Sequence, residues 1–303
     1  MGKKNTLSRS RIPLKRYGSI FVAMNKIMAI IELMRLNKPI GIYLLLWPAL
    51  LALVISTNGN FEYSHLLIVI TGSILVRSAG CVINDIWDQD LDGDVERTKT
   101  RPIPSKKLSI SESWAVFVAL GVLSLMLLSL TNTNTIFISI CFGLMIILYP
   151  LTKRFFIGPQ IFLGLTFNPT IIVYAMTNEL NNPTMIFLYF AIAAKTIAFD
   201  SFYGLCDVED DKKLGIHSTP LWWGSKTLLV IAILQFAVIS LFLIVGLKAE
   251  LSFAWYIGII LLSGFYFYQH QLASQKNFLL AFKNNHWASL YLLILSVFCF
   301  LII

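Results

Sequence analysis

Long apolar runs follow one another along almost the whole sequence, and the polar stretches between them are short. Each run approaches the ~20 residues that a helix needs to cross a bilayer. Because lipid offers the backbone no hydrogen-bond partners, such runs predict helices. Only 13% of the residues are charged, against roughly a quarter in soluble domains. We predict an all-α integral membrane protein with about nine transmembrane helices, at roughly residues 39–57, 64–84, 112–130, 134–151, 160–177, 184–205, 221–246, 251–268 and 285–303.

The Lys and Arg residues predict how these helices are oriented. With the N-terminus in the cytoplasm, 21 of the 24 basic residues fall in cytoplasmic segments, and only Lys248 falls outside. Cytoplasmic loops of membrane proteins are enriched in Lys and Arg, so this asymmetry favours that orientation. We expect residues 1–25 to form a basic cytoplasmic tail and residues 26–303 to form one polytopic domain. Residues 20–34 are compatible with an interfacial amphipathic helix.

The composition of the N-terminal segment is compatible with two cellular membranes. Residues 1–30 are basic, contain Ser and lack acidic residues, which also fits a mitochondrial transit peptide. We favour a cytoplasmic anchor, and hence a bacterial cell inner membrane. The mitochondrial inner membrane is the alternative.

Two acidic clusters interrupt the apolar sequence. Eleven of the 16 acidic residues lie within residues 85–96 and 200–211. Asp88 and Asp92 are four residues apart, and an equally spaced pair follows 119 residues later, at Asp207 and Asp211. The repeated spacing predicts two pseudo-repeated halves, and such repeats often place a shared site at their interface.

The clusters predict a metal site. Residues four apart share one face of a helix, and two facing pairs of carboxylates repel each other unless a cation lies between them. All-oxygen sites select hard ions such as Mg²⁺, which keeps positions open for phosphate oxygens. A solvated charged loop is the simpler alternative, and Asn84 could instead cap a helix end. We predict catalytic roles for Asp88, Asp92, Asp207 and Asp211, and metal binding by these four together with Asn84 and Asp85.

Basic residues near the clusters are candidates for binding a diphosphate group. The compact pair Lys153 and Arg154 is favoured, because it follows a predicted helix end. Any single basic residue here could equally reflect membrane topology. The predicted diphosphate-binding residues are Arg97, Lys153, Arg154 and Lys213, with Lys99, Arg101 and Lys212 as further candidates.

Charged residues within predicted spans are costly and usually functional. Arg77 lies seven residues before Asn84, about two helical turns, so it could bind an anionic co-substrate below the metal site. It could instead form an ion pair with Asp200. Lys195 could pair with Asp200 or contact substrate. Tyr203 could position substrate or belong to an interfacial aromatic belt.

These motifs resemble those of the UbiA-type intramembrane prenyltransferases. Residues 84–92 read NDIWDQDLD and match the family's NDxxDxxxD, and residues 207–211 match its DxxxD partner. The resemblance extends over nearly the whole chain from about residue 26. The flanks are similar to the subgroup that prenylates 4-hydroxybenzoate, at residues 34–41, 77–85, 95–102 and 207–219.

The resemblance implies a helical bundle around a central cavity, in which Mg²⁺ on the aspartates binds polyprenyl diphosphate. It implies transfer of the polyprenyl group to the ring carbon ortho to the hydroxyl of 4-hydroxybenzoate, in ubiquinone biosynthesis. Arg77 and Tyr203 would bind the aromatic acceptor, and lipid would surround the protein.

Several positions depart from the subgroup's usual residues and leave the shape of the acceptor pocket open. Other acceptors, such as haem, a dihydroxynaphthoate or homogentisate, therefore remain alternatives. An ion-coupled transporter with an acidic cation site is the alternative from another class, and nucleic acid is not expected as a partner. The departures are Gln89, Asn168-Pro169-Thr170, Lys195 and His217.

Overall fold

The computed structural model describes residues 14–93, 95 and 97–301, with side chains from residue 23 onward. Residues 1–13 of the predicted basic tail lie outside this part of the chain. The described residues are helical and contain no strand. The helices are α1 (Leu14–Leu33), α2 (Ile40–Ser56), α3 (Tyr63–Trp87), α4 (Ile110–Leu128), α5 (Thr133–Thr152), α6 (Pro159–Thr166), α7 (Thr170–Met176), α8 (Thr184–Gly204), α9 (Val208–Leu214), α10 (Thr219–Trp223), η1 (Gly224–Lys226), α11 (Thr227–Lys248), α12 (Phe253–Ser274) and α13 (Phe278–Leu301).

Each predicted span coincides with a helix or, in one case, with two. Six helical segments in the described chain are long and apolar enough to cross a membrane. The shorter α2 has 17 residues, and α12 has 22 but ends in polar turns. The last span was predicted to begin at residue 285, whereas α13 begins at Phe278. The all-helical membrane fold is confirmed, and the total of nine spans stays a prediction.

The predicted span at residues 160–177 is broken into α6 and α7. Pro169 precedes α7, and proline lacks the N–H that a continuous helix would use. Asn168 compensates for the break, because its Nδ2 donates to the Tyr189 carbonyl at 2.8 Å and its Oδ1 accepts from the Thr170 N–H at 3.2 Å. Irregular backbone at membrane depth is tolerated where protein buries it in this way.

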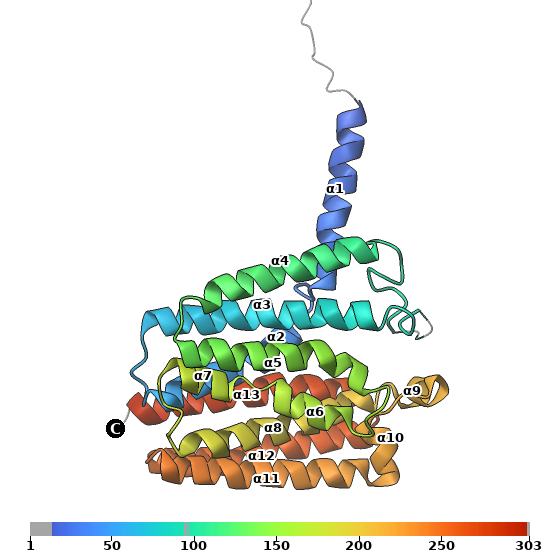
Figure 1. Ribbon diagram of the computed structural model, residues 1–303. Helices are drawn as coiled ribbons and strands as arrows, with labels where there is room; N and C mark the ends of the chain where they lie inside the picture. The colour runs from blue at the N-terminus through green and yellow to red at the C-terminus, as the bar shows by residue number, and fades with distance from the viewer. Residues whose placement is uncertain (1–13, 94, 96, 302–303) are drawn as a thin grey trace, which may run out of the picture.

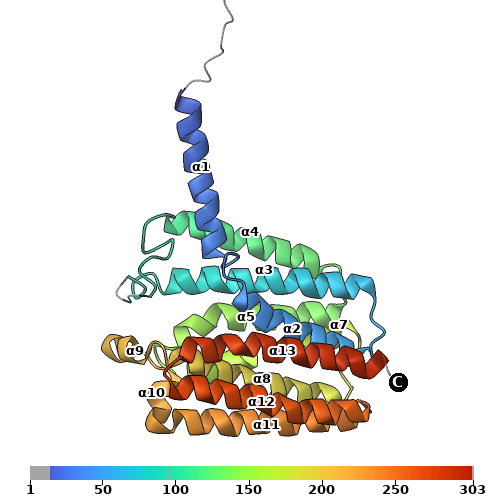
Figure 2. The ribbon, with the colours of Figure 1, turned by 180° about the vertical axis from the view of Figure 1, so that it is seen from behind.

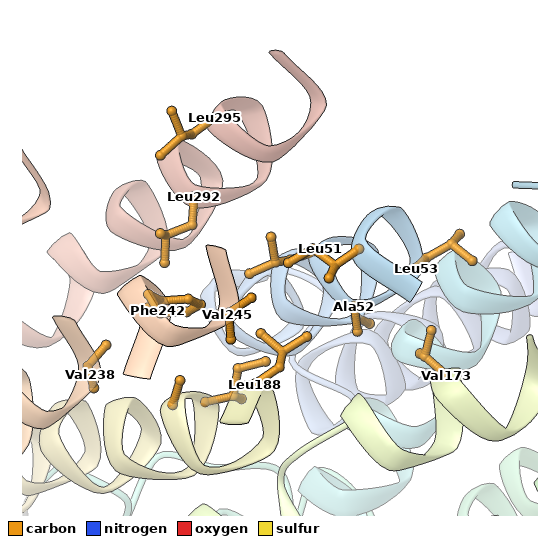
Figure 3. Packing of buried hydrophobic residues seen from close by; sticks show 14 of the residues in the cluster. Leu51, Ala52, Leu53, Val173, Leu188, Val238, Phe242, Val245, Leu292 and Leu295 are labelled. Carbon is orange, nitrogen blue, oxygen red and sulfur yellow. The ribbon is translucent and has the colours of Figure 1, made fainter. Parts of the chain in front are cut away.

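The long helices lie side by side in one bundle (Figures 1 and 2). The largest buried cluster lies mainly among α2, α8, α11, α12 and α13, and a smaller one joins α1, α3 and α4. Leu188 of α8 packs among Val245 of α11 and Leu51 of α2 (Figure 3). Large apolar side chains on the outer faces stay exposed, such as Phe236 at 71% and Ile260 at 63%. An exposed apolar surface of this extent is stable in lipid and would aggregate in water.

Both acidic motifs lie at the same end of the bundle. The first begins within the last turn of α3 and continues beyond it, and the second begins just before α9 and continues into it (Figures 1 and 2). The α1 helix stands out from the bundle beside α4 instead of lying along the other long helices (Figures 1 and 2). Two ion pairs join α1 to α4 and to the loop before α4. Lys26 pairs with Glu112, and Glu32 pairs with Lys107 at 2.9 Å.

Candidate active site

A cavity of about 1360 Å³ opens between the helices, and both acidic motifs line it. Its wall includes α3 residues from Ile68 to Asp88, a stretch of roughly 30 Å at 1.5 Å per residue. The motif end is polar, and the part between α3, α4 and α5 is mostly apolar. The cavity can therefore hold a charged group at one end and a long apolar chain along the helices.

The first motif contributes a carboxylate that lacks sufficient hydrogen-bond partners. Asp88 is 2% exposed and caps the end of α3. Its Oδ2 accepts from Lys153 Nζ at 2.6 Å and from Asn84 Nδ2 at 3.1 Å, while its Oδ1 is buried without a partner. Burial raises the pKa of Asp88 although the Lys153 ammonium lowers it. Lys153 therefore does not fully compensate the buried Asp88 carboxylate.

Two further carboxylates of this motif are held by arginines. Asp85 is 1% exposed and contacts Arg35 at 2.7 Å and Arg101 at 3.1 Å. Arg101 also contacts Asp92 at 2.6 Å. Arg101 was among the further diphosphate candidates and Arg35 was given no role, and both line the cavity wall.

The second motif is held by Arg97, an arginine from the loop that follows the first motif. Arg97 contacts both oxygens of Asp207, at 2.9 and 2.6 Å, and donates to the Tyr203 hydroxyl. The Arg97 guanidinium also lies 4.8 Å from the centre of the Tyr203 ring. Burial raises the pKa of Asp211 to about 6. As in the first motif, the environment disfavours uncompensated negative charge.

The residues fit a hard divalent cation by their chemistry. The candidate donors are carboxylate and amide oxygens, which Mg²⁺ prefers, and Asp88 Oδ1 is free to coordinate. Within residues 14–301, positions 94 and 96 aside, no three acidic, His or Cys side chains already converge on one point. One or two carboxylates per ion, with substrate oxygens completing the shell, match this looser arrangement.

The predicted diphosphate-binding residues divide into two groups. Lys153 and Arg97 lie on the cavity wall. Arg154 instead donates to the Trp87 carbonyl at 2.6 Å, and Lys213 is exposed and pairs with Asp210 at 3.5 Å. The wall therefore brings together only the first two of the four, and adds Arg35 and Arg101.

Arg77 lies deeper in the cavity and lacks an ion-pair partner in the described part of the chain. Its Nε is buried without a hydrogen bond, and its guanidinium lies 5.2 Å from the centre of the Phe167 ring. A Cβ on Gly41 would lie 2.5 Å from that Nε. Asp200 also lines the cavity, but no contact within 4.0 Å joins it to Arg77. The guanidinium can therefore receive an anion.

Lys195 lies outside the acceptor region. Its Nζ donates to Ser289 Oγ at 2.5 Å and to the Asn285 carbonyl at 3.4 Å, both on α13. It thus joins α8 to α13, and the described structure shows no pair with Asp200. Sequence reasoning overlooked His286, which lines the cavity and accepts from Trp47 Nε1 at 2.8 Å.

Comparison with known proteins gives a consistent result. Residues 45–295 match the UbiA prenyltransferase family. The 4-hydroxybenzoate octaprenyltransferase of Pseudomonas aeruginosa strain PAO1 is 39% identical over 266 residues, covering 86% of this chain and 89% of the relative. The protein of the same name from Alcanivorax borkumensis is 40% identical over 263 residues, covering 85% and 90%.

Solved structures share the fold. A UbiA homolog from Aeropyrum pernix K1 superimposes with a TM-score of 0.73 at 21% identity, covering 83% of this chain and 94% of that one. A UbiA homolog from Archaeoglobus fulgidus bound to GPP and Mg²⁺ gives a TM-score of 0.70 at 18% identity, covering 91% and 100%.

Proposed function

Because the chain belongs to the UbiA prenyltransferase family, we propose that it transfers a polyprenyl group from polyprenyl diphosphate to 4-hydroxybenzoate. The new bond forms at the ring carbon ortho to the hydroxyl, diphosphate leaves, and the product enters ubiquinone biosynthesis. The observation that carries this proposal is the single cavity that holds both acidic motifs at one end and the unpaired Arg77 below them. Relatives at 39–40% identity bear the name of this activity.

The acidic motifs supply the ligands for Mg²⁺. We assign this role to Asn84, Asp88, Asp92, Asp207 and Asp211, which all line the cavity. When bound, Mg²⁺ neutralises the diphosphate and stabilises it as a leaving group. A structure described as bound to GPP and Mg²⁺ in the same fold supports this role.

Basic side chains hold the diphosphate next to the carboxylates. Lys153 and Arg97 contact Asp88 and Asp207, so each can turn from its carboxylate toward a phosphate oxygen. Preorganised cations of this kind stabilise the negative charge that develops as diphosphate departs. Arg154 and Lys213 were predicted to share this role, and we assign them supporting positions because they bond the Trp87 carbonyl and Asp210.

The deeper cavity binds the aromatic acid. Arg77 pairs with its carboxylate in a two-point contact, which planar guanidinium groups favour. Tyr203, at the polar end, contributes to the wall between the two substrates. The apolar wall formed by α3, α4 and α5 receives the polyprenyl chain and excludes water from the allylic cation.

The charge distribution supports an inner-membrane location with the active site facing the cytoplasm. Residues 26–303 form the membrane-embedded catalytic domain, and residues 1–25 form its basic cytoplasmic tail. The basic loop 97–107 and the basic last turn of α9 lie at the same end as the motifs, as the positive-inside rule requires.

A membrane assay tests this function. Membranes that contain the protein are incubated with Mg²⁺, polyprenyl diphosphate and 4-hydroxybenzoate, and products are identified by mass spectrometry. We expect prenylated 4-hydroxybenzoate, and loss of product on chelation of Mg²⁺. Asp88→Ala should abolish turnover, whereas Asp90→Ala, at an exposed aspartate of the same motif, should retain it.

The acceptor is tested by competition. Dihydroxynaphthoate and homogentisate are offered together with 4-hydroxybenzoate at equal concentrations. Product from another acceptor alone would replace 4-hydroxybenzoate in the proposal and leave the prenyltransferase assignment intact. Absence of any prenylated product from membranes with correctly inserted protein would reject both.

A further inference from the structure

The side chain of Asp85 points away from α3 in a different direction from the neighbouring side chains of the motif. Successive helical residues are rotated by about 100°, so Asn84 and Asp88 share a face from which Asp85 is turned away. The face of Asp85 is the one that packs on α1, because Val82 and Ile86 cluster with buried residues of α1. Asp85 therefore lies between α3 and the connection from α1 to α2.

Arginines from two distant segments engage Asp85. Arg35 Nη2 lies 2.8 Å from Oδ1 and 2.7 Å from Oδ2, and Arg101 Nη1 lies 3.1 Å from Oδ1. Both Asp85 oxygens are thus occupied, in contrast to Asp88, whose Oδ1 has no partner.

The arginines extend these contacts to either side. Arg35 donates to the Glu32 carbonyl at 2.9 Å and has a left-handed backbone with φ of 58°, at the turn that follows α1. Arg101 Nη1 contacts Asp92 Oδ2 at 2.6 Å. A continuous chain of charge-assisted contacts therefore runs from the turn after α1, through Arg35, Asp85 and Arg101, to Asp92 in the cavity.

We propose that Asp85 is a positioning residue and not a metal ligand. It shares Arg101 with Asp92, which keeps that guanidinium on the cavity wall as a cation for the diphosphate. Through Arg35 it also couples α1 to the loop that carries Arg97 and Arg101. This assignment rests on the proposed function, and it replaces the sequence-based prediction that Asp85 binds metal.

Separate measurements of metal binding and of diphosphate binding distinguish a metal ligand from a positioning residue. Purified protein in nanodiscs is titrated with Mn²⁺ by electron paramagnetic resonance, with a non-hydrolysable prenyl bisphosphonate present. We expect Asp85→Asn to bind the wild-type number of Mn²⁺ ions and to weaken the bisphosphonate about tenfold, as loss of one charge-assisted hydrogen bond predicts. Asp88→Asn should lose saturable Mn²⁺ binding, and Asp90→Asn should match wild type.

Coupling through Arg35 is measured by hydrogen exchange. In Arg35→Gln we expect faster exchange in residues 97–108 and weaker bisphosphonate binding, with Mn²⁺ binding unchanged. The double variant with Asp85→Asn should weaken the bisphosphonate no more than the worse single variant, because both remove one chain of contacts. Arg35→Gln also keeps the test decisive if Asp85→Asn does not fold.

The assignment is overturned if Asp85→Asn loses Mn²⁺ as Asp88→Asn does, or if Arg35→Gln behaves as wild type in both measurements. A different result would show that the proposed function itself is wrong. If the acidic motifs do not bind metal, Asp88→Asn will retain full Mn²⁺ binding.

Discussion

At the scale of single residues, the carboxylates of the two motifs differ in what surrounds them. Asp88 keeps an unpartnered oxygen, Asp207 is matched by one exposed arginine, and Asp85 is enclosed by two. A charge buried without compensation is strongly disfavoured, so each environment limits the role that its carboxylate can have. The same reasoning applies to Arg77, whose buried Nε has no partner.

Arg77→Ala tests the acceptor site. We expect the KM for 4-hydroxybenzoate to rise roughly tenfold or more, because a hydrogen bond to a charged group contributes about 1.5–3 kcal/mol. The KM for polyprenyl diphosphate should change much less. Steady-state kinetics with each substrate varied in turn would measure both values. Arg154→Ala, which removes a cation bonded to a backbone carbonyl, is the control, and equal effects on both substrates would indicate a structural role for Arg77.

At the scale of helices, close contact between α2 and α3 shapes the acceptor region. Gly41, in the first turn of α2, leaves the space in which the Arg77 guanidinium lies. The break between α6 and α7 brings Phe167 against the same guanidinium, at 5.2 Å. Three helical segments therefore fix the position of one charge.

Gly41→Ala should displace that charge. The added Cβ would lie 2.5 Å from Arg77 Nε and 2.7 Å from Nη2, closer than van der Waals contact allows. We expect the KM for 4-hydroxybenzoate to rise several-fold, as even small misplacement of a positioning group is costly. Gly121→Ala is the matched control, because a Cβ there meets nothing within 4 Å although the residue also lines the cavity. Unchanged acceptor kinetics in Gly41→Ala would argue against this placement of the acid.

At the scale of the whole molecule, charge and shape separate the two ends of the bundle. The acidic motifs and the basic residues near them gather at one end, and α11, which ends at Lys248, runs from that end to the other (Figure 1). This arrangement predicts which end a reagent confined to one side of the membrane can reach.

Cysteine labelling tests the orientation. In a background with Cys141→Ser and Cys206→Ser, which removes the exposed thiols of the described chain, Lys213→Cys and Lys248→Cys are introduced separately. An impermeant maleimide should label Lys213→Cys in inverted vesicles and Lys248→Cys in right-side-out vesicles. Both positions are exposed. The opposite pattern would place the active site on the outer side.

The sequence by itself determined the class of fold and predicted the chemistry of the site. Apolar run length specifies transmembrane helices because the bilayer core has a defined thickness, and the paired Asp spacing predicts an all-oxygen site. Only the tertiary structure decided which basic residues meet which carboxylates. Arg35 and Asp85 are 50 positions apart in the sequence, and Arg97 and Asp207 are 110 apart. Such distant pairings depend on helix packing that no local pattern records. Packing likewise divided one predicted span at Pro169 and brought Arg35 and Arg101 onto Asp85.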